Sequence, residues 1–220
     1  MNFSTLFRMR ENLNLDKRTL VILRWIAIIG QLTTVNLVYF YLDLDFPVLT
    51  CHGVLLIGLL TNVYLQFGIK TILLKDLYAG IFLIYDLIQL TFLLYLTGGI
   101  SNPFSILMII PAIVSSTFLS IGTTVILGLL TIIFLFILTI FHYPLPGLHE
   151  HSITFPKLYL IGYFLAIILG LVFLSYFGIR FSGESNRRSD AINKLQQVIA
   201  KEYELESLGG QAAAAAHSLG

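Results

Sequence analysis

Six long apolar segments constrain this chain more than any other feature of its sequence. A helix that crosses a bilayer needs about 20 mostly apolar residues, and such segments lie at 20–42, 48–68, 77–97, 103–120, 121–141 and 157–180. Only 11% of the 220 residues are charged, whereas soluble domains carry roughly a quarter, so the chain cannot cover its own surface with polar groups. We therefore predict an all-α polytopic membrane protein with six transmembrane helices. The boundary between the fourth and fifth, at Ser120–Gly122, is the least defined.

The distribution of lysine and arginine predicts the orientation, because these residues concentrate in cytoplasmic flanks. With six crossings, only Lys157 falls on the outer side. The inner side carries Arg8, Arg10, Lys17, Arg18, Arg24, Lys70, Lys75, Arg180, Arg187, Arg188, Lys194 and Lys201. We predict that both termini are cytoplasmic and that the connectors 43–47, 97–102 and 142–156 face outward.

The chain divides into three parts: a cytoplasmic segment at 1–19, a membrane domain at 20–180 and a cytoplasmic region at 181–220. Polar and charged residues prevail after Ser182. Apolar ones recur there at steps of three, four and seven, namely at Ala191, Leu195, Val198, Leu205 and Ala212. That spacing is typical of coiled coils, although Glu202 interrupts it. We predict a helix that continues the sixth span and pairs with a copy of itself; the alternative is a single solvated helix.

The connector "GGISNPF" combines two glycines, an Asn-Pro pair and an aromatic ring. Gly98 and Gly99 permit positive φ and leave the backbone open to a ligand. Asn102 and Pro103 are typical of an N-cap and a first helical position, and Phe104 adds a flat apolar face. These residues suit a planar, lipid-soluble molecule with polar oxygens, such as a quinone, which the helix amides could bind. A well-made interhelical turn is the alternative, and the residues alone favour it.

The C-terminal stretch "ESLGGQAAAAAHSLG" places His217 opposite the apolar stripe, among small neighbours. A neutral imidazole in such an open position can act as a nucleophile toward phosphate. An alanine-rich tail with an incidental histidine is the alternative.

Polar residues inside the spans are few. Asp86, with Gln89 one turn on, lies in the third span, where such groups usually face the bundle interior. Hydrogen bonding between helices is the favoured interpretation, and proton-coupled sensing is the alternative. We expect Trp25 to be an interfacial anchor and Arg24 to extend to the cytoplasmic headgroups.

The remaining cysteine, histidines and net charge bear on disulfides, metal sites and nucleic-acid binding. The single cysteine, Cys51, excludes an intramolecular disulfide and any zinc site built from cysteines. His149, Glu150 and His151, with His142 nearby, could bind a metal, but a solvated outer loop is favoured and no metal is predicted. A net charge of +1 gives no attraction to nucleic acid.

Three motifs together resemble the RegB/PrrB/ActS family of redox-sensing histidine kinases. "GGISNPF" is similar to the family's GGxxNPF quinone motif and "AAAAAHSLG" to its H-box, while "LRWIAIIGQ", which ends at Gln31, looks like its first membrane helix. The resemblance implies a homodimeric inner-membrane sensor kinase, a transferase that autophosphorylates and signals to a response regulator. It also implies ubiquinone or menaquinone bound at Gly98, Gly99, Asn102, Pro103 and Phe104, with His217 as phosphoacceptor.

The sequence departs from the family pattern in three ways. Ser218 stands where an acidic residue, a candidate general base, commonly follows the phosphoacceptor. The chain stops at Gly220 inside the H-box, so ATP would bind to a domain absent here, and 181–220 would be a linker helix with the start of the phosphoacceptor domain. The family's redox cysteine would lie beyond that stop, and its role is not transferred to Cys51.

Two other functions are compatible with the apolar segments. A small transporter would use Asp86 and the histidines as its substrate path, although no internal repeat of the kind common in transporters is visible. A non-catalytic scaffold that only dimerises is the second alternative.

Overall fold

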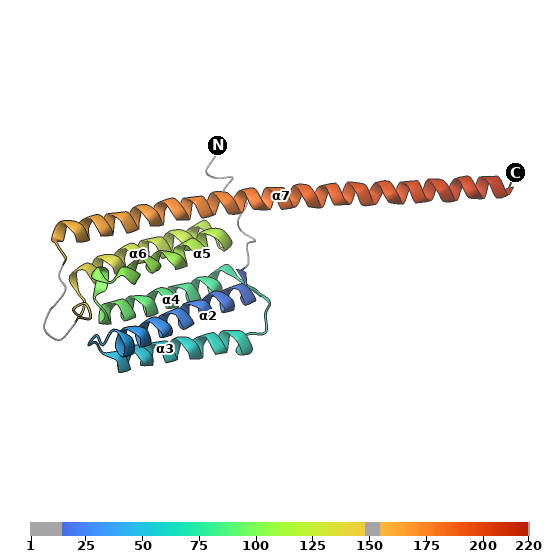
Figure 1. Cartoon of the computed structure of the whole chain (residues 1–220). Helices are drawn as coiled ribbons and strands as arrows, with labels where there is room; N and C mark the ends of the chain where they lie inside the picture. The colour runs from blue at the N-terminus through green and yellow to red at the C-terminus, as the bar shows by residue number, and fades with distance from the viewer. Residues whose placement is uncertain (1–14, 148–154, 220) are drawn as a thin grey trace. The chain divides into compact units, whose positions relative to one another are not determined.

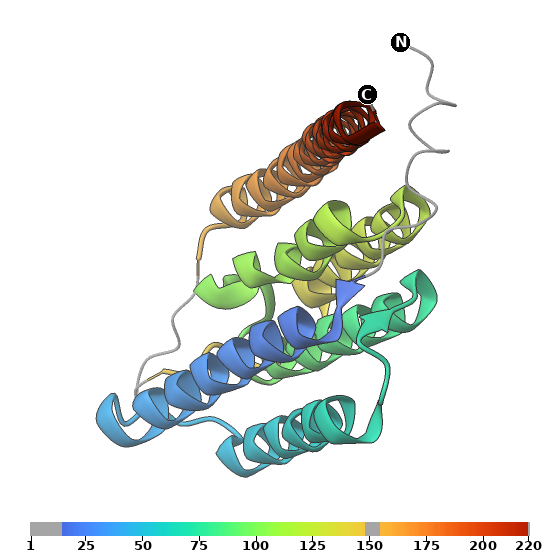
Figure 2. The same ribbon diagram turned by 90° about the vertical axis from the view of Figure 1, so that its right-hand side faces the viewer.

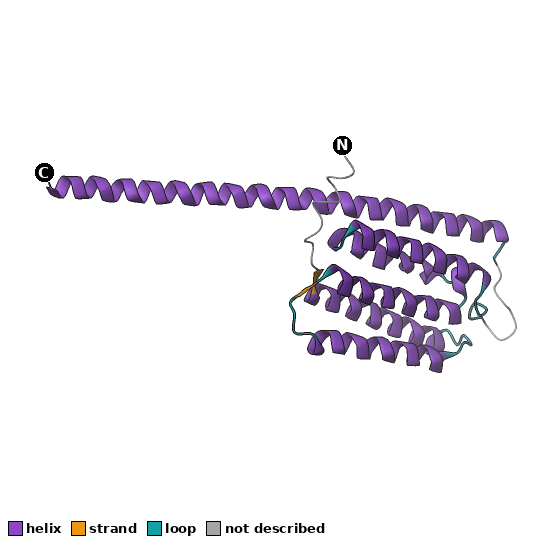
Figure 3. Ribbon diagram, turned by 180° about the vertical axis from the view of Figure 1, so that it is seen from behind, coloured by secondary structure: helices purple, strands orange, loops and turns teal. Residues whose placement is uncertain are grey.

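The computed structural model describes residues 15–147 and 155–219, without the side chains of residues 207 and 210–219. It contains two compact units, Met1–Ile179 and Arg180–Gly220. The helices are α2 (Lys17–Asn36) with a π-helical end η1 (Leu37–Tyr41), α3 (Val48–Val63) with a π-helical end η2 (Tyr64–Gly68), α4 (Asp76–Leu96), the 3₁₀ segments η3 (Gly99–Ser101) and η4 (Pro103–Ile109), α5 (Ile110–Phe118), α6 (Ile121–Ile140) and α7 (Lys157–Leu219). The strands β1 (Leu15–Asp16) and β2 (Leu73–Leu74) form one short antiparallel pair. The all-α prediction is confirmed apart from this pair (Figure 3).

The first unit is a layered helical bundle. In Figures 1 and 2, α3 lies on one side, α2 and α4 form the next layer, α5 and α6 follow, and the first part of α7 lies beyond them. Buried leucines from several helices, among them Leu20, Leu87, Leu127 and Leu171, form one core cluster. Many large apolar side chains stay exposed on the outer faces, such as Ile26 of α2 and Phe136 of α6. An exposed apolar surface of this extent is typical of a protein surrounded by lipid.

In the part of the chain that the structure describes, five helices are long and apolar enough to cross a membrane: Lys17–Tyr41, Val48–Gly68, Asp76–Leu96, Ile121–Ile140 and Lys157–Glu206. They match five of the six predicted spans. The predicted fourth span is the shorter helix Pro103–Phe118, so a membrane protein is supported, and six crossings stay a prediction.

Pro111 explains why this fourth segment differs. Proline has no N–H to donate and its ring clashes with the preceding turn, so a regular α-helix does not extend across it. The segment starts instead as a 3₁₀-helix, and the Ile110 N–H bonds the Leu107 carbonyl three residues back. A 3₁₀-helix rises about 2.0 Å per residue, against about 1.5 Å in an α-helix. Pro103–Phe118 therefore extends over about 27 Å despite its few residues.

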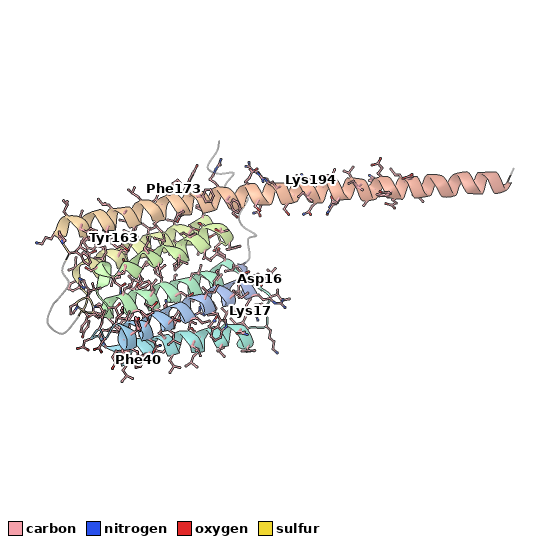
Figure 4. The ribbon with its side chains drawn as sticks, in the orientation of Figure 1. Asp16, Lys17, Phe40, Tyr163, Phe173 and Lys194 are labelled. Carbon is pink, nitrogen blue, oxygen red and sulfur yellow. The ribbon has the colours of Figure 1, made fainter. Side chains whose placement is uncertain are left out.

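The connectors between the helices lie at two ends of the bundle. The turn end contains the connectors 42–47, 97–102 and 141–147, where the Tyr143 N–H donates to the Tyr95 carbonyl at 2.8 Å. The ladder end contains the β1–β2 pair and the α5–α6 connection. Figure 4 shows Phe40 and Tyr163 at the turn end, and Asp16 and Lys17 at the ladder end.

Asp76 joins two helices at the ladder end. Its Oδ1 accepts from the Ser120 N–H at 2.6 Å, and its Oδ2 accepts from the hydroxyls of Ser120 at 2.9 Å and Thr123 at 2.5 Å. One carboxylate at the start of α4 therefore satisfies donors at the start of α6. Lys17 has a similar part in α2, since its Nζ donates to the Gln66 and Ile69 carbonyls at the end of η2.

The second unit consists of the later part of α7. Its apolar stripe is exposed in a single chain: Leu195 is 60% and Val198 62% accessible. A partner helix would cover such a stripe, but the predicted coiled coil stays a prediction because one chain does not test it.

Candidate functional sites

The connector "GGISNPF", residues 98–104 and here called the glycine turn, follows the end of α4. Gly98 has φ 110° and Gly99 has φ 57°, values that residues with a side chain rarely adopt. Two consecutive positive φ angles reverse the chain in a few residues. The glycines are therefore required by the backbone whatever else the turn does.

The glycines also permit a close approach of the segment after α6. A Cβ at Gly98 would lie 2.5 Å from Cδ1 of Leu145, and one at Gly99 would lie 2.5 Å from the Leu138 carbonyl oxygen and from Cγ of His142. The expectation that the glycines leave the backbone open is therefore wrong. Protein atoms of residues 138–145 fill that space.

Asn102 caps the helix that follows, as predicted. Its Oδ1 accepts from the Phe104 N–H at 2.9 Å, and its Nδ2 donates to the carbonyl and hydroxyl oxygens of Thr97 at 3.0 and 2.8 Å. The Ser105 N–H donates to the Asn102 carbonyl at 2.9 Å. The sequence predicted that the first amides of this helix could bind a ligand oxygen. The amides of Phe104 and Ser105 are instead bonded to Asn102.

The exposed part of the glycine turn is Pro103 and Phe104, and Phe104 is 43% accessible. The next residue, Ser105, is fully buried. Its Oγ lies 3.2 Å from the hydroxyl of Tyr163 on α7, which in turn donates to the Pro103 carbonyl at 3.1 Å. Sequence analysis missed Tyr163; the four-residue spacing of Tyr159 and Tyr163 along one face of α7 was its signal.

The side chain of His142 packs against Gly99 of the turn. Its Nδ1 lies 2.7 Å from the Tyr143 carbonyl, which can only accept, so Nδ1 carries the proton. In the neutral ring Nε2 is then an acceptor. His149, Glu150 and His151 lie outside the described residues. Among the side chains that the structure describes, no three of the types that bind metals are gathered together.

A second polar group lies inside the bundle, between α2, α3 and α4. The guanidinium of Arg24 donates through Nε to Asp86 Oδ1 at 2.9 Å and through Nη2 to Thr61 Oγ1 at 2.8 Å. Its Cζ lies 5.4 Å from the ring centroids of both Phe82 and Tyr85. Arg24 is only 3% accessible. The prediction that it extends to the headgroups is wrong, because Asp86, Thr61 and the two rings bind it inside the bundle.

The other polar residues chosen from the sequence also connect helices. Gln89 Nε2 donates to Gln31 Oε1 at 3.2 Å, between α4 and α2. Trp25 Nε1 donates to Gln66 Oε1 at 3.2 Å, between α2 and η2. Gly58 of α3 lies directly against the Gln89 amide, where a Cβ would overlap it. The favoured interpretation of Asp86 and Gln89, hydrogen bonding between helices, agrees with these contacts.

Two buried atoms beside this ion pair lack a hydrogen-bond partner: Nη1 of Arg24 and Oδ1 of Asn62. Asn62 is fully buried, and its Nδ2 lies 3.4 Å from the Val21 carbonyl. An unsatisfied buried polar atom costs about 1–3 kcal/mol. The cluster is therefore only partly satisfied.

The other two sites can be placed only in part. The backbone at His217 is helical, since α7 extends to Leu219, but its side chain lies outside the described residues. Cys51 is buried in α3 as a free thiol.

Comparison with known proteins relates the chain to sensor histidine kinases. The chain is similar to two curated proteins, both named Sensor histidine kinase RegB and both from Cereibacter sphaeroides, with 38% identity over 204 residues in each case. The similarity covers 92% of this chain and 44% of each relative, so the chain spans less than half the length of the curated relatives it matches. No family model and no solved structure matches it. The similarity to RegB confirms the resemblance that the three sequence motifs indicated.

Proposed function

We propose that this relative of RegB is the membrane sensor part, with the start of the phosphoacceptor region, of a two-component sensor histidine kinase in the bacterial inner membrane. The observation that carries the proposal is the 38% identity to a sensor histidine kinase over 92% of the chain. Autophosphorylation is proposed for a full-length protein that also has an ATP-binding domain. The similarity favours neither alternative, the transporter or the scaffold.

We further propose six crossings, with both termini in the cytoplasm and the turn end facing outward. The geometry of Pro103–Phe118 supports this topology. Asn102, at its start, is bonded to Thr97 at the end of α4, and Ser120, after its end, is bonded to Asp76 at the start of α4. A length of about 27 Å is close to the roughly 30 Å of a bilayer core.

The ligand we propose for the glycine turn is a membrane quinone, ubiquinone or menaquinone. The resemblance to the GGxxNPF motif supports this ligand, and the contacts divide the motif residues by role. Gly98, Gly99 and Asn102 shape the turn, while Pro103 and Phe104 offer the exposed apolar surface. An aromatic ring that stacks on Phe104 would gain about 0.5–1.5 kcal/mol. Nε2 of His142, whose ring packs against Gly99, would be an acceptor for a quinol hydroxyl.

Signalling would proceed through two packings of the bundle, whose populations differ between occupied and empty quinone sites. The change would alter the presentation of His217 on a dimeric helix. Phosphate would then pass from ATP to His217 and on to a response regulator. The stripe of Leu195 and Val198 supports the homodimer, because both side chains are exposed in one chain.

Phosphorylation can be tested on the chain itself. We expect the purified chain, mixed with the catalytic domain of a related sensor kinase and radiolabelled ATP, to become labelled at a histidine. His217→Gln should abolish the label, while Ser218→Ala, at the next position, should keep it. Label that persists in His217→Gln would refute the phosphoacceptor assignment.

Quinone binding needs a separate experiment. A photoreactive quinone should label residues 98–104 of the chain in lipid nanodiscs, and native quinone should compete. Phe104→Ala should weaken this labelling about fivefold, the equivalent of about 1 kcal/mol. The matched control is Phe136→Ala, which removes an exposed ring from α6. Equal labelling of both variants would refute the site.

A further inference from the structure

Tyr163 connects the glycine turn to the helix that would carry the signal. Its hydroxyl donates to the Pro103 carbonyl at 3.1 Å and accepts from Ser105 Oγ at 3.2 Å. Both partners belong to the first turn of η4, directly beside the exposed Phe104 ring. One side chain of α7 is therefore bonded to the segment on both sides of that ring.

The Ser105 hydroxyl is one of the two groups that bond the Tyr163 hydroxyl. Ser105 is fully buried, so its hydroxyl has to find its partner within the protein. The acceptors within reach are the Ile100 carbonyl at 3.3 Å and the Tyr163 hydroxyl at 3.2 Å. Tyr163 thus completes a polar contact in a place that is otherwise apolar.

The ring of Tyr163 is held in position by two aromatic neighbours, Tyr159 on α7 and Phe155 just before the helix begins. Tyr159 stacks on it with centroids 6.3 Å apart and planes only 4° apart, and Phe155 stacks on Tyr159 at 5.2 Å and 23°. A ring held in such a stack has little freedom to swing. Movement of the first turn of η4 would therefore move α7 itself, or break the two hydrogen bonds.

Many membrane proteins have tyrosines at the headgroup level for anchoring alone. Tyr159 fits that description, since it is exposed. Tyr163 differs, because it is half-buried and bonded to residues nearly 60 positions earlier in the chain. Anchoring by itself does not require that contact.

We infer that Tyr163 is the positioning residue through which ligand occupancy of the glycine turn is transmitted to α7. The inference rests on the proposed function and adds the path by which the signal reaches α7. A ligand on Phe104 displaces the first turn of η4, and the two hydrogen bonds of Tyr163 convert that displacement into movement of the first part of α7. Tyr163 does not contribute to the affinity for the ligand.

The experiment separates binding from transmission. In a Cys51→Ser background, spin labels at Leu129→Cys on α6 and Tyr176→Cys on α7, both exposed positions, report the distance between these helices. Labelled chains are diluted with unlabelled ones in lipid nanodiscs, so that only distances within one chain are measured. Quinone binding is followed in the same samples by the photoreactive analogue.

We expect quinone to shift the distance distribution in the parent chain. Tyr163→Phe, which removes only the hydroxyl, should keep the photolabelling and lose the shift. Ser105→Ala should do the same from the other side of the contact. Tyr159→Phe, one turn away, should keep both signals.

Each other outcome has a definite meaning. A shift that persists in Tyr163→Phe and Ser105→Ala overturns the inference, and so does a parent chain that binds quinone without any shift. Absence of photolabelling in the parent chain refutes the proposed quinone site instead. Loss of labelling in Tyr163→Phe alone would make Tyr163 a binding residue and would also overturn the inference.

Discussion

The ion pair between Arg24 and Asp86 should dominate the stability of the α2–α3–α4 part of the bundle in an asymmetric way. Removal of one charge leaves the other enclosed in an apolar interior. Replacement of both by apolar residues removes the desolvation cost together with the attraction. We therefore expect Asp86→Leu to be much more destabilising than the double variant Arg24→Met/Asp86→Leu.

The contacts of Arg24 and Asp86 allow the loss of unfolding free energy in each variant to be estimated. In Asp86→Leu the guanidinium, 3% accessible, loses its carboxylate and keeps only Thr61 and the two rings, which should cost about 3–5 kcal/mol. In the double variant the Thr61 hydroxyl still donates to the Gly58 carbonyl at 2.8 Å, and the unpartnered Nη1 is gone. The double variant should therefore lie within about 2 kcal/mol of the parent.

Equilibrium unfolding in mixed micelles measures these free energies. Trp25 is the only tryptophan of the chain and is bonded to Gln66 close to the cluster, so its fluorescence reports the region directly. The single variant Arg24→Met completes a double-mutant cycle with Asp86→Leu and the double variant. A double variant whose destabilisation equals the sum of the two single variants would refute the coupling, and a loss below about 1 kcal/mol in Asp86→Leu would show that the interior tolerates the lone charge.

Three further predictions concern other parts of the bundle. Asp76→Ala removes the acceptor of three hydrogen bonds at the start of α6 and should cost about 2–3 kcal/mol of unfolding free energy, against about 1 kcal/mol for Asp16→Ala, which removes a single cap; equal losses would contradict the connecting role. Gly99→Ala should destabilise by about 2 kcal/mol because of its positive φ and its close neighbours, whereas Gly128→Ala, in mid-helix with open space around it, should stabilise by about 0.5–1 kcal/mol. Reporter fusions after residues 152 and 184 should report the outer and inner compartments respectively, and the same compartment for both would refute the six-crossing topology.

The features predicted correctly from the sequence are those that local chemistry determines. Long apolar segments become helices because the lipid-facing backbone has to bond within its own segment. Asn102 caps the following helix because its side chain reaches an amide two residues away. The 3₁₀ start of the fourth segment, Pro103–Ile109, was not predicted, although Pro111 was its local signal.

The features that the sequence did not predict depend on which helices become neighbours. Arg24 and Asp86 are 62 positions apart, and the hydropathy of each segment gives no indication that α2 and α4 are adjacent. Without that partner, the expected destination of a lysine or arginine near a helix end is the headgroup region. Thr61 and Asn62 were missed for the same reason, since the partners of these polar residues of α3 lie on a different helix, α2.

The glycine turn shows how a sequence motif can combine residues with different tasks. Gly98, Gly99 and Asn102 are required by backbone conformation, packing against residues 138–145 and helix capping, all of which apply with or without a ligand. Substitution of any of them alters the fold of the turn as well as any site on it. Loss of signalling in those variants would therefore not distinguish a ligand site from a well-made turn. Phe104 can make that distinction, because its ring is exposed and its removal leaves the turn's hydrogen bonds intact.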